Sequence, residues 1–198
     1  MTAILKVDTI QDTAGNNIIN ESSDTITIGA SGDTIALAGT TVTGITQGIT
    51  VADSWRLTAN ITNTDADITA NLERDDTAGV GFIGSAMTQS SGVFTFPSTG
   101  IYQITFFTSW SVSNENESYA KILTTINNSS YTTRGQVYAS TTGGDHIKSA
   151  STYCFFDVTD TSNCKIKFAT ASMNSSCTLR GSSTINDTSM VFLRLGNT

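Results

Sequence analysis

Charged residues, proline, histidine and cysteine are all scarce in this 198-residue chain. Charged residues make up 14% of it, about half of the usual share, and Glu, Lys, Ala and Leu are too few for a helical enzyme. Thr, Ser, Asn, Gly and Asp are abundant instead, which suits β-strands joined by turns. No apolar run approaches the ~18 residues that cross a bilayer, and no apolar signal segment opens the chain. We therefore expect a protein made in a cytosol, without membrane insertion.

Acidic residues outnumber basic ones, which gives a net charge of −7. A negative protein is repelled by phosphate backbones and by anionic lipid headgroups, so neither nucleic acid nor an anionic membrane is the expected partner. The acidic residues are spread along the chain without a block of like charges. We interpret the excess as a contribution to solubility.

The three cysteines do not form a disulfide framework. Cys154 and Cys164 flank a predicted hairpin turn at residues 160–163, in which Val158 would face Lys165. This pairing separates the two cysteines by about 17 Å along the ladder, whereas a disulfide requires α-carbons within about 7 Å. We predict free, mostly buried thiols that act as small apolar side chains.

Residues 1–50 differ from the rest of the chain because they contain no aromatic residue and no proline. An Asp-Thr-Ile motif recurs at residues 8–10, 24–26 and 33–35. Such a segment has too few large apolar groups to fold alone. It is either a disordered arm or a source of short strands for a repetitive stalk built from several chains. The regular isoleucine spacing favours the stalk, because disordered segments are depleted in β-branched apolar residues.

Residues 51–76 form a transition that introduces the first aromatic residue, Trp55. We predict strands at 57–61 and 68–72 around a polar loop, followed by a charged loop at 73–76.

Short strands with turn-rich breaks fill residues 77–198. The predicted strands are 93–96, 100–112, 118–126, 132–139, 147–158, 164–171, 177–181 and 189–195. Many short strands with frequent turn signals indicate a sandwich or a barrel. No stretch shows a sustained 3.6-residue apolar period, so we expect almost no helix.

The stretch Gly92–Phe106 carries the clearest core pattern in the chain. A strand, a Pro/Gly corner and a second strand follow one another, with aromatic residues at alternate positions. Since strand side chains repeat every two residues, Tyr102 and Ile104 should share one face with Phe106. Trp110 continues that face, and we predict that it is buried.

Three segments together resemble the C1q/TNF-like trimeric jelly roll. Phe94, five intervening residues and Gly100-Ile-Tyr-Gln-Ile-Thr-Phe106 are similar to the family pattern of an aromatic, five residues and Gly-x-Tyr-x-Phe-x-aromatic, with Ile104 in place of Phe. Residues 149–168 look like the family's long strand, turn and return strand, and residues 189–195 look like its closing strand. The resemblance covers residues 75–196 and implies a trimeric sandwich head.

Domains of this family usually stand at the end of a trimeric stalk, which in animals is often collagen. A collagen stalk is excluded here, because the chain has no Gly-x-y repeat and almost no proline. The N-terminal part instead resembles fibre proteins of marine bacteriophages, at residues 5–10, 24–46 and 52–57. This second resemblance implies a virion protein and assigns no role to individual residues.

Catalytic chemistry is not expected. The only histidine, His146, follows Asp145 in a predicted loop, and no nucleophile is identifiable near the pair. The sequence has no Gly-x-Ser-x-Gly elbow, no phosphate-cradling loop and no His/Cys metal spacing. We predict no catalytic residue, no cofactor and no metal; a polysaccharide-degrading enzyme is the least favoured of the functions considered.

Two further side-chain groups have a weaker claim to a ligand. Asp65 with Asp67, and Asp75 with Asp76, offer oxygen atoms on loops, but neither pair matches a calcium-loop motif, so solvated loops are favoured. Aromatic rings can stack on sugars, and the candidates are Trp110, Tyr119, Tyr131 and Tyr138. A core or inter-subunit role is favoured for most of them, with Tyr131 the best candidate for an exposed contact.

The sequence therefore predicts an all-β protein with a stalk and virion-attachment segment at 1–50, a transition at 51–76 and a C1q-like jelly-roll head at 77–198. The predicted function is a homotrimeric bacteriophage tail fibre or spike, assembled in the host cytoplasm and carried on the virion, whose head binds a host surface glycan or protein. The N-terminal segment would bind other virion proteins. The alternative is a capsid decoration or tail adaptor with a purely structural role. The candidate receptor-contact residues are Asn114, Glu115, Asn116, Asn128, Tyr131, Asp145 and His146.

Overall fold

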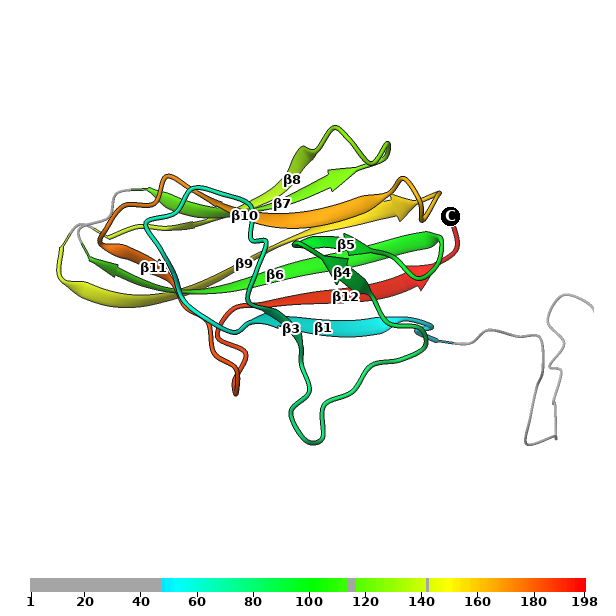
Figure 1. Ribbon diagram of the computed structural model, residues 1–198, viewed down its shortest axis with the longest axis horizontal. Helices are drawn as coiled ribbons and strands as arrows, with labels where there is room; N and C mark the ends of the chain where they lie inside the picture. Colours follow the sequence, from blue (N-terminus) through cyan, green and yellow to red (C-terminus); the bar gives the residue numbers. More distant parts are fainter. Residues whose placement is uncertain (1–47, 114–116, 142) are drawn as a thin grey trace, which may run out of the picture. The chain divides into compact units, whose positions relative to one another are not determined.

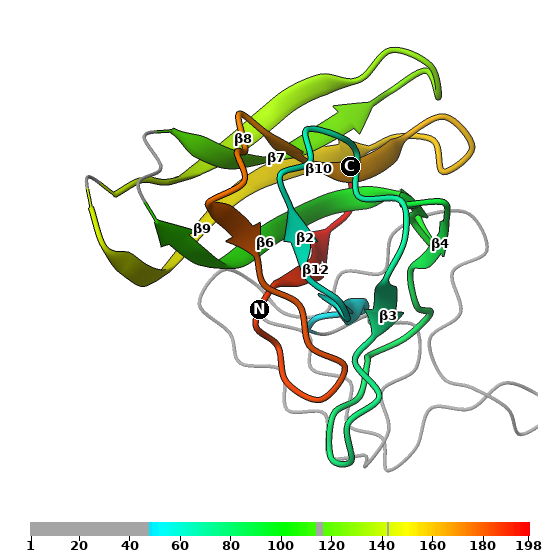
Figure 2. The same ribbon diagram turned by 60° about the vertical axis from the view of Figure 1, so that its left-hand side comes forward.

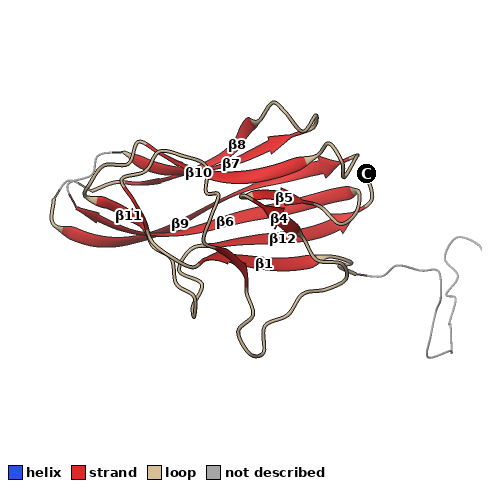
Figure 3. Cartoon of the chain, viewed as in Figure 1, coloured by secondary structure: helices blue, strands red, loops and turns tan. Residues whose placement is uncertain are grey.

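The computed structural model describes residues 48–113, 117–141 and 143–198, and these form β-strands without any helix (Figures 1 and 3). None of the described segments is a helix long and apolar enough to cross a bilayer. The predicted stalk at 1–50 lies outside the described residues except for its last three. The strands are β1 Ala52–Leu57, β2 Ile61–Thr62, β3 Leu72–Arg74, β4 Thr88–Ser90, β5 Val93–Thr95, β6 Gly100–Ser113, β7 Ser118–Thr125, β8 Thr132–Ala139, β9 Asp145–Val158, β10 Lys165–Ala171, β11 Cys177–Leu179 and β12 Ser189–Gly196.

The strands form two antiparallel sheets that pack face to face (Figure 2). One sheet has seven strands in the order β2-β11-β6-β12-β1-β3, with β9 paired to the other edge of β6. The second has five strands in the order β4-β5-β10-β7-β8. Strand β6 is the centre of the larger sheet, because it pairs with β9 along its length, with β12 over its first half and with β11 near its end.

The core is an aromatic cluster that joins the two sheets. Phe94 of β5 lies with its ring centroid 5.3 Å from Trp55, 5.7 Å from Phe168 and 5.2 Å from Phe192. Trp55 and Phe192 belong to the seven-stranded sheet, whereas Phe94 and Phe168 belong to the five-stranded sheet. Each ring therefore buries apolar surface against the opposite layer, which is the main source of stability in a sandwich.

The strand predictions for the second half of the chain are confirmed, with ends that differ by a few residues. Tyr102, Ile104, Phe106 and Trp110 all point inward and are buried, as the alternation predicts. Gly100 begins β6 with φ 141°, and an added Cβ would lie 2.4 Å from the carbonyl oxygen of Gly196. Only glycine fits this corner of the sandwich.

Two predictions for the first strands are wrong. Strand β1 begins at Ala52 instead of residue 57, and β3 spans Leu72–Arg74, so part of the expected charged loop is strand. The pattern of β1 is concealed by Asp53, a buried carboxylate that points inward with Trp55. Asp53 is stabilised there because it accepts hydrogen bonds from Trp55 Nε1 at 3.1 Å and from the Met87 amide at 2.8 Å.

The predicted hairpin across residues 160–163 is also wrong. Strand β9 pairs with β6, whereas β10 pairs with β5 and β7, so the turn crosses from one sheet to the other. A short turn can join two strands of one sheet or cross between two sheets. The alternation of side chains along each strand is the same in both cases. The cysteine prediction is nevertheless confirmed, because all three thiols are free and buried. Burial raises the pKa of the Cys154 thiol to about 11, which keeps it protonated.

Replacing Phe94 with Ala should lower the free energy of unfolding by about 3–5 kcal/mol, since the change removes a ring that contacts both sheets. Ile126→Ala is the matched control; its side chain is exposed, and the change should stay within about 0.5 kcal/mol. Urea unfolding followed by tryptophan fluorescence measures both. An Ile126→Ala loss as large as that of Phe94→Ala would contradict this account of the core.

Candidate functional site

The two ends of the sandwich are different in kind, and we name them base and apex. At the base, the chain comes into the described region at Gly48 and the last strand ends at Gly196. Arg194 holds these segments together, because it donates hydrogen bonds to Thr50 Oγ1 at 3.0 Å and to the Thr99 carbonyl at 2.8 Å. Val51 is buried beside this contact and also accepts a hydrogen bond from the Arg194 amide.

The apex carries the connections β6–β7, β8–β9 and β10–β11, at the left of Figure 1. Ser118 Oγ donates to the Ser172 carbonyl at 3.0 Å, and the Ser113 amide donates to the Ser176 carbonyl at 2.9 Å. These bonds fix the β10–β11 connection beside the end of β6 and the start of β7. The apex is thus the end of the sandwich away from Gly48.

Of the predicted contact residues, Asp145 and His146 lie at the apex. The expectation of a loop there is wrong, since both residues are the first of β9 and pair with Ser113 and Val112 of β6. Both side chains are exposed, and His146 Nε2 is 2.8 Å from the Gly143 carbonyl oxygen. Asn114, Glu115 and Asn116 fall outside the described residues.

Asn128 and Tyr131 lie at the base, in the connection between β7 and β8. Asn128 has φ 53°, and its amide donates to the Asn163 carbonyl at 2.9 Å. Tyr131 is half-buried, because the ammonium of Lys167 lies 4.1 Å from its ring centroid. The predicted residues therefore do not form one site, and Tyr131 is not the most exposed of the candidate aromatic residues.

The outward face of the seven-stranded sheet carries large apolar side chains in solvent. Tyr153 and Phe155 of β9 are 61% and 60% exposed, and their rings make an edge contact at 5.7 Å. Phe107 of β6 and Leu195 of β12 are exposed on the same sheet. We call Phe107, Tyr153, Phe155 and Leu195 the association face. Alternation along β9 predicts that Tyr153 and Phe155 share one face of the strand. The sequence does not say whether that face points to the core or to solvent, and in the structure it points outward.

A groove lies beside the association face, next to Phe107. It is lined by Ser149 and Ser151 of β9 and by Asn186 and Asp187 of the loop before β12. Its walls combine hydroxyl, amide and carboxylate groups with the apolar surfaces of Phe107 and Ala150. Nothing in this lining supplies a nucleophile paired with a base.

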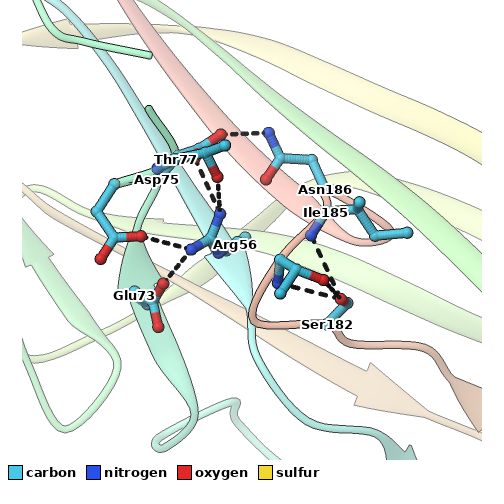
Figure 4. A network of polar contacts seen from close by, with 9 residues as sticks. Arg56, Glu73, Asp75, Thr77, Ser182, Ile185 and Asn186 are labelled. Atoms are coloured by element: carbon cyan, nitrogen blue, oxygen red, sulfur yellow. Dashed lines mark hydrogen bonds and ion pairs between the residues drawn. The ribbon is translucent and has the colours of Figure 1, made fainter. Parts of the chain in front are cut away.

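A buried ion-pair network holds the segments that border this side of the sheet (Figure 4). Arg56 is 2% exposed, and it pairs with Asp75 at 2.9 Å, with Asp76 at 2.6 Å and with Glu73. Its Nη1 also donates to Thr77 Oγ1 at 2.8 Å. The guanidinium therefore ties β1 to the chain that follows β3.

Asp75 connects the same network to the loop before β12. Its Oδ2 accepts a hydrogen bond from Asn186 Nδ2 at 2.6 Å (Figure 4). Burial raises the pKa of Asp75, but the hydrogen bonds from Asn186 and Thr77 and the charge of Arg56 outweigh it, so that the pKa lies below its usual value. Asp75 is therefore a charged, buried group whose stability depends on these partners.

The carboxylates considered for calcium are engaged by the protein itself. Asp65 Oδ1 accepts the Met173 amide at 2.8 Å, and Asp67 pairs with Lys167 at 2.6 Å. Asp75 and Asp76 both pair with Arg56. Within residues 48–113, 117–141 and 143–198, no group of three His, Cys, Asp or Glu residues could hold a metal ion.

Replacing Arg56 with Met should lower the free energy of unfolding by about 3–5 kcal/mol, because Asp75, with a side chain only 4% exposed, is then charged and buried without its cation. Asp76→Asn is the control; its side chain is 77% exposed, so the loss should stay below about 1 kcal/mol. Equal losses would contradict the distinction between the buried and the exposed pair.

The same network predicts a pH dependence. Since the folded pKa of Asp75 lies below the unfolded value of about 4, its contribution is present above that value and is lost as the pH falls through the folded pKa. Urea unfolding between pH 7 and the acid range should show Asp75→Asn with a shallower acid loss than the wild-type protein. An unchanged slope would remove Asp75 as a cause.

Comparisons with known proteins identify the fold and nothing finer. No family model matches the sequence, and no curated protein matches it. The Eiger TNF from S. frugiperda superposes with a TM-score of 0.52 at 9% identity, over 77% of this chain and 96% of that chain. Murine APRIL at pH 8.0 gives 0.47 at 12% identity (73% and 98% covered), and the PRD1 vertex protein P5 gives 0.42 at 18% identity (76% and 100% covered). Only the first score exceeds 0.5, and with the sheet topology it shows that residues 48–198 have a TNF-like jelly-roll fold.

Proposed function

We propose that this protein is a homotrimeric fibre or spike of a bacteriophage virion whose jelly-roll head attaches to the host surface. Residues 1–50 serve as stalk and attachment to other virion proteins, residues 51–76 supply the first strands, and residues 77–198 form the rest of the head. The role is binding and structural, without catalysis. The observation that carries the proposal is the association face, because its exposed apolar side chains are buried when one copy binds another.

The occupant of the association face is a second copy of the chain. Its four large apolar side chains lie on one sheet, where a soluble monomer gains nothing by exposing them together. Tyr153 and Phe155 are the kind of aromatic anchor that dominates protein interfaces. The face includes β9, the strand at the edge of the sheet, where two neighbours of a closed ring can meet and cover that edge.

The base and apex give the assembly a direction. A stalk that precedes Gly48 is joined to the head at the base, and the apex faces away from the junction. Host contacts therefore belong to the described residues of the apex, which include Asp145 and His146 at the start of β9. Asn114, Glu115 and Asn116 lie outside the described residues and stay a prediction. Asn128 and Tyr131 belong to the base and support the head instead.

Weak binding by each head is sufficient for attachment. Several heads on one particle turn each further contact into an intramolecular event, which raises the overall affinity by roughly 10²–10⁴. The rigid sandwich holds its connecting loops in place, so they need not become ordered each time a ligand binds. The alternative function is a capsid decoration or tail adaptor, for which the same association face is required but the apex has no ligand.

The double substitution Tyr153→Ser with Phe155→Ser should convert the trimer to a monomer near 20.9 kDa in analytical ultracentrifugation. The wild-type protein should sediment at three times this mass. Tyr138→Ser, which removes an exposed ring from the other sheet, should leave the trimer intact. A wild-type monomer, or a variant that remains trimeric, would contradict the assignment of the association face.

Host attachment is tested with the purified full-length protein and cells of candidate host bacteria. Fluorescently labelled protein should bind the susceptible strain and compete with infection by the particle. The monomeric double variant should compete far less well, because it lacks avidity. Failure of the wild-type trimer to bind or compete would favour the purely structural alternative.

A further inference from the structure

The five-stranded sheet has a charge distribution opposite to that of the whole chain. The protein has a net charge of −7, but strands β4, β5, β7, β8 and β10, all within the described residues, contain no Asp or Glu. Four of the ten basic residues belong to these strands: Lys121, Arg134, Lys165 and Lys167. One carboxylate, Asp67, bridges to Ala169 at the edge of this sheet and is paired with Lys167. The basic excess of the strands themselves favours an anionic partner on that side of the molecule.

An aromatic platform lies on the outward face of this sheet, at its apex end. Tyr119 of β7 and Tyr138 of β8 are cross-strand partners with ring centroids 5.1 Å apart, and Tyr138 is 51% exposed. The adjacent pair along the same strands is Lys121 with Gln136. The ammonium of Lys121 lies 5.6 Å from the centroid of Tyr119, and the Tyr138 hydroxyl donates to Gln136 Oε1 at 3.3 Å.

The neighbouring strand places small side chains beside this platform. Ala171 of β10 pairs with Tyr119, and Ala169 pairs with Lys121; Ala169 is buried, and Asp67 bridges to it from the far side. None of the ion pairs among the described residues includes Lys121, whereas Lys167 farther along the sheet is engaged by Asp67. Lys121 therefore differs from Lys167 in having its charge available to a ligand.

We propose that Tyr119, Lys121, Gln136 and Tyr138 form a binding site for a saccharide that carries a carboxylate. The apolar face of a pyranose ring stacks on Tyr138, which Tyr119 holds in place. The carboxylate accepts a hydrogen bond from the Lys121 ammonium, and a sugar hydroxyl accepts one from the Gln136 amide group. This inference rests on the proposed host attachment and names the ligand class and the surface responsible for it.

The position of the platform is compatible with assembly. It lies on the outer surface of the five-stranded sheet, whereas the association face lies on the outer surface of the seven-stranded sheet, and the two layers pack back to back through the core. A threefold ring requires a second patch on each copy, which we place at the β9 edge, so that the platform stays in solvent. Its place next to the β6–β7 and β8–β9 connections also puts it at the end directed away from the base.

Full-length protein is titrated with sialyllactose and with oligogalacturonate, and with lactose and maltotriose as neutral counterparts. The acidic saccharides should bind at least about tenfold more tightly than the neutral ones. Tyr138→Ala and Lys121→Gln should each weaken that binding about tenfold or more, and added salt should weaken it in the wild-type protein.

Matched controls separate the platform from general effects of charge and aromatic content. Lys167→Gln removes a lysine of the same sheet whose ammonium is already paired with Asp67. Tyr131→Ala removes a tyrosine at the base. Both should leave saccharide binding unchanged. Lys121→Gln changes a half-buried position on the outward face and keeps the proposal testable if Tyr138→Ala does not fold, which urea unfolding reports.

Each outcome distinguishes this inference from the proposed function. If the wild-type protein binds acidic saccharides and the two platform variants lose this binding, the inference is supported even if intact cells are not bound. Cells bound equally by wild-type protein and platform variants overturn the inference and leave host attachment standing. No saccharide binding up to about 1 mM, or equal binding of neutral saccharides, also overturns it. Competition by single-stranded oligo-dT would instead identify a polynucleotide surface and overturn it.

Discussion

The contact between the two sheets through Phe94 and its aromatic neighbours is the constraint on which the other features depend. These rings come from β1, β5, β10 and β12, which are far apart in the sequence, so they hold the layers in one relative position. Once the inward faces are committed to this contact, alternation fixes what each strand presents to solvent. The association face and the tyrosine platform are therefore products of core packing, although neither touches the core. The network around Arg56 adds a second attachment, because it joins β1 to two surface segments that the core does not reach.

The sequence predicts the elements of this fold more reliably than their arrangement. The aromatic alternation of Gly92–Phe106 is sufficient to predict buried Tyr102, Ile104, Phe106 and Trp110, since a long run of large apolar side chains on one face is most stable when it is buried. Strand β1 escapes prediction because Asp53 points inward, and only hydrogen bonds from distant residues explain that placement. The candidate contact residues share only their polarity and their predicted turns, which cannot say at which end of the sandwich a turn lies. Asp145 and Asn128 consequently fall at opposite ends. The association face is visible only when the partner of β9 is known.

The head divides its surface by chemistry. The seven-stranded sheet presents large apolar side chains, and β7, β8 and β10 of the five-stranded sheet present tyrosine, amide and ammonium groups and contain no carboxylate of their own. The first kind of surface gains free energy by excluding water, and the second retains water while offering directional donors and aromatic faces. Because the two sheets pack face to face through one core, their outer surfaces point away from each other. Self-association and ligand binding thus need not compete for the same strands.

The position of the first strand has a mechanical consequence. Strand β1 begins at the base with Ala52 and runs toward the apex between β12 and β3. A head anchored through its N-terminal side and held by a ligand near the apex is pulled along the direction of its strands. Antiparallel hydrogen bonds lie perpendicular to the strands, so such a load shears the whole β1–β12 ladder at once instead of opening it one bond at a time. Arg194 reinforces the first point of loading through Thr50. The same fold anchored from the apex would lack this arrangement. In the proposed attachment role, the direction of the chain therefore favours resistance to tension between particle and cell.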